Sequence, residues 1–270
     1  MARELGLADE APVVVADRSN LVLRIGPVIA RVAMATSMVR IGMAWLKREV
    51  EISRFLAARD VGVTRPIAGP FEREGFVISF WEAENVGASP NPAAAGAELR
   101  RAHEALAGYR GELPLWGGFE EARMVLPRAK AQMTPAERKI VDRAWDRAER
   151  IVADARKRSA SFQPVHGDAH IGNVLSTSRG VLWTDWEDAF LGPVEFDLAC
   201  LRSRAELFGE DVEAIEAMTA AYGASNLELV RDLGLVRNVQ VIPWLAVFSE
   251  RDPDLLPRMR ARIFKLEFDA

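Results

Sequence analysis

The fold is decided by the stretch His166-Gly167-Asp168-Ala169-His170-Ile171-Gly172-Asn173, together with Val181-Leu182-Trp183-Thr184-Asp185-Trp186-Glu187 a little further on. It places Asn173 five residues after Asp168, and Asp185 after a short apolar run. Phosphoryl transfer uses such a set, because one carboxylate orients an acceptor hydroxyl while an amide oxygen and a second carboxylate hold the magnesium that bridges nucleotide phosphates. The pattern therefore indicates a kinase that acts on small molecules.

The spacing of these residues has a physical reason. Gly167 and Gly172 suit a tight loop, since glycine adopts backbone angles closed to other residues and lets charged groups approach the main chain. Residues 174–183 are typical of two short apolar strands joined by a polar turn that contains glycine. We expect that hairpin to bring Asp185 back beside Asn173.

Two strings in this region, HGDAHIGNVL and TDWEDAFLGPVEFDLACL, resemble the catalytic core of the aminoglycoside phosphotransferase and choline kinase superfamily, which shares its fold with the protein kinases. In that family a histidine-glycine-aspartate, here residues 166–168, forms the catalytic loop. An aromatic residue and an acid follow the metal aspartate, as Trp186 and Glu187 follow Asp185 here. The glycine-proline at 192–193 and the aspartate-leucine-alanine at 197–199 are also similar, so the resemblance covers residues 160–202 most strongly.

The resemblance implies an α+β, bilobal, protein-kinase-like fold. Residues 1–82 would form a small β-rich nucleotide-binding lobe, and residues 83–270 a larger, mainly helical lobe with the catalytic loop and the acceptor site. Its cofactors would be ATP or GTP, and Mg²⁺. The implied roles are Asp168 as base, Mg²⁺ ligation by Asn173 and Asp185, and support of the catalytic loop by His166 and Asp197.

Composition is compatible with such an enzyme. The 270 residues are 49% hydrophobic, which is ample for a core. The single cysteine, Cys200, allows no intramolecular disulfide, and no secretory signal or membrane span is visible, so we expect a cytoplasmic protein with no membrane partner. A net charge of -4 and a pI near 5.6 argue against nucleic-acid binding and tolerate a cationic substrate. The sequence gives no indication of oligomeric state.

The first eighty residues predict a small sheet, with strands at 13–16, 20–25 and 28–33 and a Gly26-Pro27 turn between the last two. In the resemblance, Arg31 occupies the strand position where kinases usually carry a phosphate-contacting lysine. The one lysine of this region, Lys47, lies in a predicted helix. Arginine grips phosphate bidentately but is longer and planar, so the exchange is not neutral.

That helix is predicted from Met38 to Ala58, with Glu49 inside an apolar stripe. A carboxylate in such a stripe needs a partner. In the family the partner is the phosphate-contacting base, so we expect an ion pair between Glu49 and Arg31. The alternative places Glu49 at the edge of the stripe, in water.

The sequence indicates less clearly the loop that would cover the nucleotide, here called the covering loop, and the hinge between the two lobes. Residues 16–22 contain no glycine, so Ser19 and Asn20 could donate to phosphates or simply form a β-turn. The strand Phe76–Glu82 leads into a Ser/Pro-rich stretch. By resemblance, the backbone of Phe80, Trp81 and Glu82 would hydrogen-bond adenine, whereas the alternative is a plain sheet edge.

Two helices of the remaining chain are predicted for packing. Leu99, Ala102, His103 and Leu106 form one apolar stripe. The second helix begins at Thr134-Pro135-Ala136-Glu137, where threonine caps, proline takes the first turn and glutamate completes a capping box.

Some residues allow more than one interpretation. His166, Asp168 and His170 could ligate a transition metal in a metal-dependent hydrolase, although the chain has only three histidines. His170 otherwise has no assigned role. Glu187 would add a metal contact or face solvent, and Asp188 is expected to be solvated.

The expected reaction is transfer of the ATP γ-phosphoryl group to a hydroxyl of a small molecule, either an aminoglycoside-like antibiotic or a related metabolite. Acidic residues at 206–216 could attract a polyamine-like acceptor, but such a run is more typical of a solvated helix face. Tryptophans could instead line a pocket for choline-like or macrolide-like acceptors; these are Trp116, Trp183, Trp186 and Trp244. The alternative is a nucleotide-binding pseudokinase with a regulatory or scaffold role, suggested by the missing strand lysine and glycine loop.

Overall fold

The computed structural model describes residues 1–17, 20–33, 42–209 and 211–268, and within these ranges the side chains of residues 205–208 and 268 are left out of the description. Contacts within the chain group it into two compact units. The first unit is made of residues 1–111 and 171–189, and the second of residues 112–170 and 190–270. This grouping differs from the predicted lobe boundary after residue 82. The assignment of nucleotide and acceptor sites to residues 1–82 and 83–270 stays a prediction.

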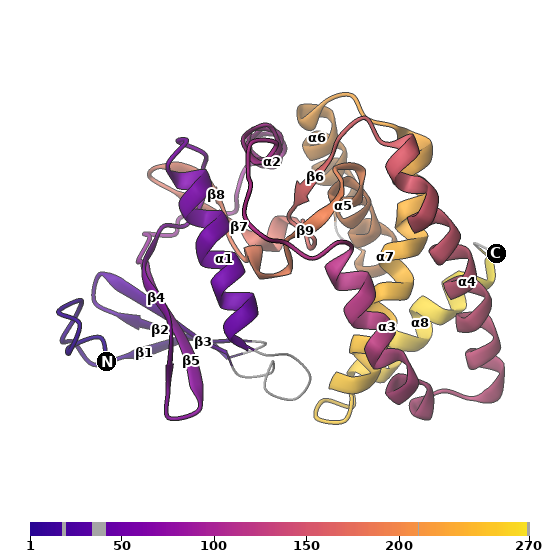
Figure 1. The fold of residues 1–270 in the computed structure, drawn as a ribbon, viewed down its shortest axis with the longest axis horizontal. Coiled ribbons are helices and arrows are strands. Elements are labelled where there is room, and N and C mark those ends of the chain that lie inside the picture. Colours follow the sequence, from indigo (N-terminus) through magenta and orange to yellow (C-terminus); the bar gives the residue numbers. More distant parts are fainter. Residues whose placement is uncertain (18–19, 34–41, 210, 269–270) are drawn as a thin grey trace. The chain divides into compact units, whose positions relative to one another are not determined.

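The first unit is built on a five-stranded antiparallel sheet in the order β1-β2-β3-β5-β4 (Figure 1). Its strands are β1 (Val13–Asp17), β2 (Asn20–Ile25), β3 (Val28–Ala33), β4 (Pro66–Arg73) and β5 (Phe76–Glu82). Four of them were expected from the sequence. The fifth, β4, contains two prolines, which lack the N–H that a strand donates, and it accordingly lies at an edge of the sheet.

The alternation of side chains on β3 divides its residues between the two faces of the sheet. Val28 and Ala30 are buried and pack with Phe80 of β5 in an apolar cluster. Ile29 and Arg31, which alternate with these two residues, point to the other face, because successive strand side chains alternate. Gly26, at a φ of 55°, forms the predicted turn into β3.

Helices and a hairpin complete the first unit. The helices are α1 (Gly42–Ala57) and α2 (Pro92–Leu106); of the predicted range 38–58, residues 38–41 lie outside the described chain. The short helix η3 (Ile171–Asn173) leads into β7 (Val174–Thr177) and β8 (Gly180–Trp183), which form the predicted hairpin, and η4 (Trp186–Asp188) follows. The Thr184 N–H donates to the carbonyl of Asn173 at 3.0 Å, so the backbone returns to Asn173 just before Asp185, as expected.

The second unit is mainly helical. Its small sheet consists of two strands, β6 (Phe162–Val165) and β9 (Phe190–Pro193). Its helices are α3 (Gly117–Ala129), η2 (Lys130–Gln132), α4 (Pro135–Arg158), α5 (Glu195–Phe208), α6 (Val212–Tyr222), α7 (Leu227–Phe248) and α8 (Leu255–Phe268) (Figure 1). Helix α7 packs against α3, α4, α5 and α8, so apolar residues surround it on most sides. In the part of the chain that the structure describes, no helix is long and apolar enough to span a membrane.

The capping box of α4 is present as predicted. The Thr134 hydroxyl accepts from the Glu137 N–H at 3.2 Å, and the Glu137 carboxylate accepts from the Thr134 N–H at 2.7 Å. We predict that Thr134→Ala lowers the free energy of unfolding by about 1 kcal/mol, because a helix N–H loses its acceptor. Denaturant unfolding would measure the change, with Thr134→Ser as the control that keeps a cap. Equal stabilities for the alanine and serine variants would contradict the prediction.

Candidate active site

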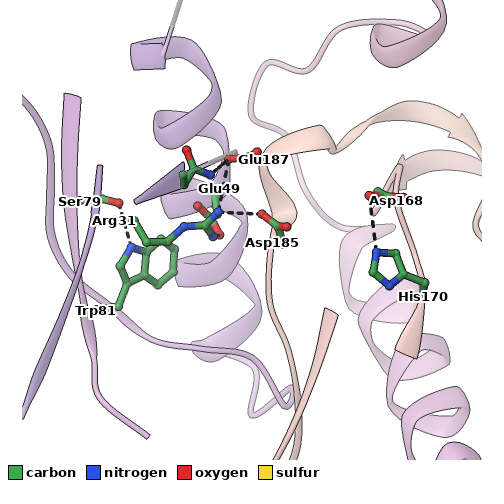
Figure 2. A network of polar contacts seen from close by, with 9 residues as sticks. Arg31, Glu49, Ser79, Trp81, Asp168, His170, Asp185 and Glu187 are labelled. Atoms are coloured by element: carbon green, nitrogen blue, oxygen red, sulfur yellow. Dashed lines mark hydrogen bonds and ion pairs between the residues drawn. The ribbon is translucent and has the colours of Figure 1, made fainter. Parts of the chain in front are cut away.

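Arg31 is the centre of a buried ionic network in the first unit (Figure 2). From β3 its guanidinium pairs with Glu49 of α1, and its Nη2 lies 2.7 Å from Asp185 Oδ1 and 3.4 Å from Glu187 Oε2. The Arg31 side chain is 11% exposed and that of Glu49 only 1%. The expected ion pair between Arg31 and Glu49 is therefore present, and the alternative that places Glu49 in water is wrong.

The charges of this network do not balance. Three carboxylates face one guanidinium, and in a poorly hydrated site the excess negative charge is costly. Burial raises the pKa of Glu49 above its usual value; Arg31 opposes this rise, and the charges of Asp185 and Glu187 add to it. Burial lowers the pKa of Arg31, but the three carboxylates raise it by more. The network would therefore be stabilised by a further positive charge.

Glu187 belongs to the same network. It is 5% exposed, and its Oε2 accepts from Asn20 Nδ2 at 2.8 Å, while its backbone carbonyl accepts from Arg48 Nη1 at 2.9 Å. The alternative in which Glu187 faces solvent is wrong. Ser19, the other residue named for the covering loop, lies outside the described chain, and phosphate donation by Asn20 stays a prediction.

Asp185 has an unusual backbone conformation. Its φ of 68° and ψ of 46° lie in the left-handed region, just before η4. Aspartate is one of the few residues other than glycine that adopts this region with some frequency. Such conformations persist where surrounding contacts fix them and are often found at functional sites. Here the contact with Arg31 holds the carboxylate, whose side chain is 33% exposed.

A cavity of about 390 Å³ lies in the first unit beside this network, within the size range of small-molecule sites. Five residues predicted to bind cofactor or metal line it; they are Arg31, Trp81, Glu82, Asn173 and Asp185. Phe80 does not, because it is 2% exposed and packs with Val28 and Ala30 in the sheet core. Glu49 contacts Arg31 but is not part of the cavity wall. These five residues are spread over more than 150 positions of the sequence, and their roles in binding cofactor or metal stay predictions.

The backbone N–H groups at the end of β5 already donate hydrogen bonds to other residues of the first unit. The Glu82 N–H donates to the Arg65 carbonyl and the Ala83 N–H to the Pro27 carbonyl, each at 2.9 Å. The Trp81 indole N–H donates to the Ser79 hydroxyl at 2.8 Å (Figure 2). Adenine contacts predicted for residues 80–82 would therefore compete with these bonds. The next segment also reaches the cavity, through Glu84 and Val86.

The catalytic-loop sequence lies in the second unit, directly after β6. The Asp197 carboxylate accepts from the His166 N–H at 2.7 Å and the Gly167 N–H at 2.8 Å. His166 is wholly buried, and its Nδ1 accepts from the Asp168 N–H at 3.3 Å. Gly167 has a φ of 85°, which requires glycine. The loop contacts expected for His166 and Asp197 are present. A nitrogen that accepts a backbone N–H cannot also ligate a metal, which argues against a metal-dependent hydrolase built on His166 Nδ1.

Asp168 is held by a residue that the sequence did not point to. Its carboxylate pairs with Arg237 of α7, 69 positions away. Its Oδ2 lies 3.7 Å from His170 Nε2 (Figure 2). Burial raises the pKa of Asp168, but the positive charge of Arg237 and contacts with His170 and His166 lower it by more, so the carboxylate is ionised at neutral pH. One feature could have indicated Arg237: it stands between Val236 and Asn238, which are both buried in α7, and a charged residue in such a place needs a partner.

Comparison with known proteins agrees with this description. The sequence model described as the phosphotransferase enzyme family matches residues 13–233. No curated protein sequence shows significant similarity.

Solved structures of the same fold include amicoumacin kinase hAmiN in complex with AMP-PNP, Ca²⁺ and Ami, which is 15% identical with a TM-score of 0.70 over 97% of this chain and 92% of that one. A choline/ethanolamine kinase family protein from Mesorhizobium loti is 16% identical, with a TM-score of 0.70 over 98% and 89%. The GDP and kanamycin complex of APH(2")-IIia is 13% identical, with a TM-score of 0.71 over 99% and 97%. These structures share a protein-kinase-like fold, and because the family match spans most of the sequence, the chain belongs to the phosphotransferase enzyme family.

Proposed function

We propose that the protein transfers the γ-phosphoryl group of ATP, or of GTP, to a hydroxyl group of a small molecule. The observation that carries this proposal is the cavity of the first unit, in which a guanidinium, an amide and a carboxylate meet at Arg31, Asn173 and Asp185. These groups suit a metal-bound polyphosphate. Membership of the phosphotransferase family supports the reaction type.

The cavity fits a magnesium ion chemically. Mg²⁺ prefers oxygen ligands and is commonly held by one or two protein groups together with substrate phosphates. Asn173 and Asp185 both line the cavity and would supply these ligands. The excess of carboxylates around Arg31 gives a further reason for a cation there. When bound, Mg²⁺ would neutralise charge on the β- and γ-phosphates.

Asp168 would orient the acceptor hydroxyl. Its pKa is held down by Arg237, so the carboxylate is ionised but only weakly basic. That state suits phosphoryl transfer, whose loose transition state needs the nucleophile positioned more than deprotonated early. Arg237 would then act through Asp168, by fixing the direction of the carboxylate.

The acceptor is proposed to be an aminoglycoside-like antibiotic or a related metabolite, so the activity would confer resistance if the acceptor is an antibiotic. Two solved relatives carry Ami and kanamycin in their complexes. The acidic segment gives this choice little support, since Asp211 caps α6 by accepting from the Glu213 N–H at 2.9 Å and Glu213 is exposed. Three of the four tryptophans named for a choline-like pocket give it no support, because Trp116, Trp183 and Trp186 are buried in the cores of their units. The fourth, Trp244, is half-buried and stacks on Phe248.

A second candidate is a pseudokinase that binds nucleotide without transferring phosphate. One observation favours it: in the structure both key carboxylates are engaged by arginines, Asp185 by Arg31 and Asp168 by Arg237. A non-catalytic protein could keep these pairs permanently. The second of the three experiments that follow separates the two candidates, because both would bind nucleotide and only the kinase would transfer phosphate.

The first experiment tests the metal and nucleotide site by thermal unfolding with ATP or GTP, with and without Mg²⁺. A nucleotide at about a hundred times its Kd should stabilise the wild type by about 2.7 kcal/mol. Asp185→Asn should abolish the magnesium-dependent part, because it removes one charged ligand. Asp188→Asn, an acid three residues on that does not line the cavity, is the control. Equal magnesium effects in both variants would argue against metal binding by Asp185.

The second experiment tests Asp168 by assaying phosphate transfer to kanamycin, choline, ethanolamine and simple sugars. We predict that Asp168→Asn keeps nucleotide binding but lowers kcat by about 10²–10⁴, the usual effect of losing such a group. Glu250→Gln is the matched control, because it also removes an ion pair with an arginine of the second unit, Arg128. The side chains of Glu250 and Asp168 are similarly exposed, at 31% and 29%. Unchanged kcat in Asp168→Asn would remove the residue from the mechanism.

The third experiment replaces Arg31 with lysine. Lysine offers a single charged group, so it cannot contact Glu49 and Asp185 in the forked geometry of the guanidinium. We expect Arg31→Lys to weaken nucleotide binding at least tenfold and to lower the melting temperature. Arg48→Lys should have a much smaller effect on nucleotide binding, because this arginine donates to the Glu187 carbonyl and does not line the cavity. A higher kcat/KM in Arg31→Lys would show that arginine is a poor phosphate ligand here.

A further inference from the structure

The second unit contains a cavity of about 480 Å³ that the proposed phosphotransfer reaction does not use. Its wall is formed by helices α4, α5, α7 and α8, which lie together in this unit (Figure 1). Each helix contributes one cation, and the four are Arg147, Arg202, Arg231 and Lys265. We call it the basic cavity. None of its lining residues lines the cavity of the first unit.

Acidic residues are scarce among the residues that line the basic cavity. Asp232 is the one acidic residue among those that line it, and its carboxylate lies 2.6 Å from a further cation, Arg158. Arg202 and Arg231 form no hydrogen bond or ion pair with any other residue that the structure describes. The whole chain has a net charge of -4, so this local excess does not follow from composition. Converging like charges raise the local potential and favour a bound anion.

Gly234 adds a second, independent observation. It lies inside α7, where glycine costs about 1 kcal/mol relative to alanine. Packing does not require it, because a Cβ at Gly234 would meet no atom within 4 Å. At Gly118 of the same unit, by contrast, a Cβ would lie 2.4 Å from the Gln240 side chain. The missing side chain at position 234 therefore leaves space in the cavity wall.

The chemistry of the wall indicates what would fit. Guanidinium groups bind phosphate in a forked geometry, and several cations favour a ligand with more than one negative charge. Leu227 is 66% exposed and lines the basic cavity together with Val230 and Leu235, so part of the wall is apolar. The volume falls in the range of small-molecule sites.

We propose that the basic cavity is a binding site for a small phosphate-bearing molecule, held by Arg147, Arg202, Arg231 and Lys265 over the space left by Gly234. This site is independent of the reaction proposed above, and it would exist equally in an active kinase or in a pseudokinase. It gives the second unit a means of responding to a phosphorylated small molecule.

The test is calorimetric titration of inorganic pyrophosphate, at low ionic strength and with EDTA, into the wild type and three variants. Arg202→Glu/Arg231→Glu reverses two cations of the wall. Gly234→Leu fills the space without changing charge, and leucine is a good helix former. Lys139→Glu/Arg251→Glu is the control, since it makes the same change in net charge at exposed positions of the second unit outside the cavity. Melting curves verify that each variant is folded.

We expect one binding event in the wild type that weakens at least tenfold, or about 1.4 kcal/mol, in both cavity variants and persists in the control. Equal weakening in the two charge-reversal pairs would show a general effect of net charge and overturn the proposal. Binding that survives in both cavity variants, or no binding to the wild type, would overturn it as well. None of these results would bear on phosphate transfer or on metal binding, which the Asp168→Asn and Asp185→Asn experiments test separately.

Discussion

The first unit depends on one guanidinium surrounded by three carboxylates. Arg31 joins strand β3 to helix α1 through Glu49 and to the segment after β8 through Asp185 and Glu187, so one side chain connects three elements distant in sequence. Buried charges are tolerated only when paired, and removing one partner leaves the others unpaired. The same side chain faces the cavity in which a nucleotide is proposed to bind. Stability and ligand binding in this unit therefore rest on shared charges.

The second unit uses carboxylates differently. Asp197 is fully buried, and its carboxylate accepts hydrogen bonds from the backbone N–H groups of His166 and Gly167. These two bonds fix the shape of the loop. Asp168 is partly exposed and is held by a side chain, Arg237. Backbone bonds fix where the loop runs, whereas a side-chain ion pair can be exchanged for a bond to another molecule. Asp197, which holds the loop from α5, thus has a fixed environment, and Asp168 of the loop has an exchangeable one.

The sequence predicted what local patterns determine. Apolar and alternating runs identified β1, β2, β3 and β5, and the capping box identified the start of α4. The place of Glu49 in a helix stripe called for a partner, and the family resemblance pointed to Arg31. It did not predict β4, because its prolines hide the strand pattern. Nor did it predict the pairing of Asp168 with Arg237 or the basic cavity, since both arise from packing of helices far apart in sequence. Helix packing decides which surface charges converge, and no local pattern records it.

The left-handed backbone of Asp185 places a double requirement on that position. The ion pair with Arg31 requires a carboxylate at position 185. The turn of the chain into η4 requires a residue that adopts a positive φ. Glutamate would meet the first requirement but fit the backbone less well, and glycine would meet only the second. Aspartate is the one amino acid that meets both at low cost. Charge and conformation at this position can therefore be varied separately in the laboratory, by comparing asparagine, which changes mainly the charge, with glutamate, which changes mainly the geometry.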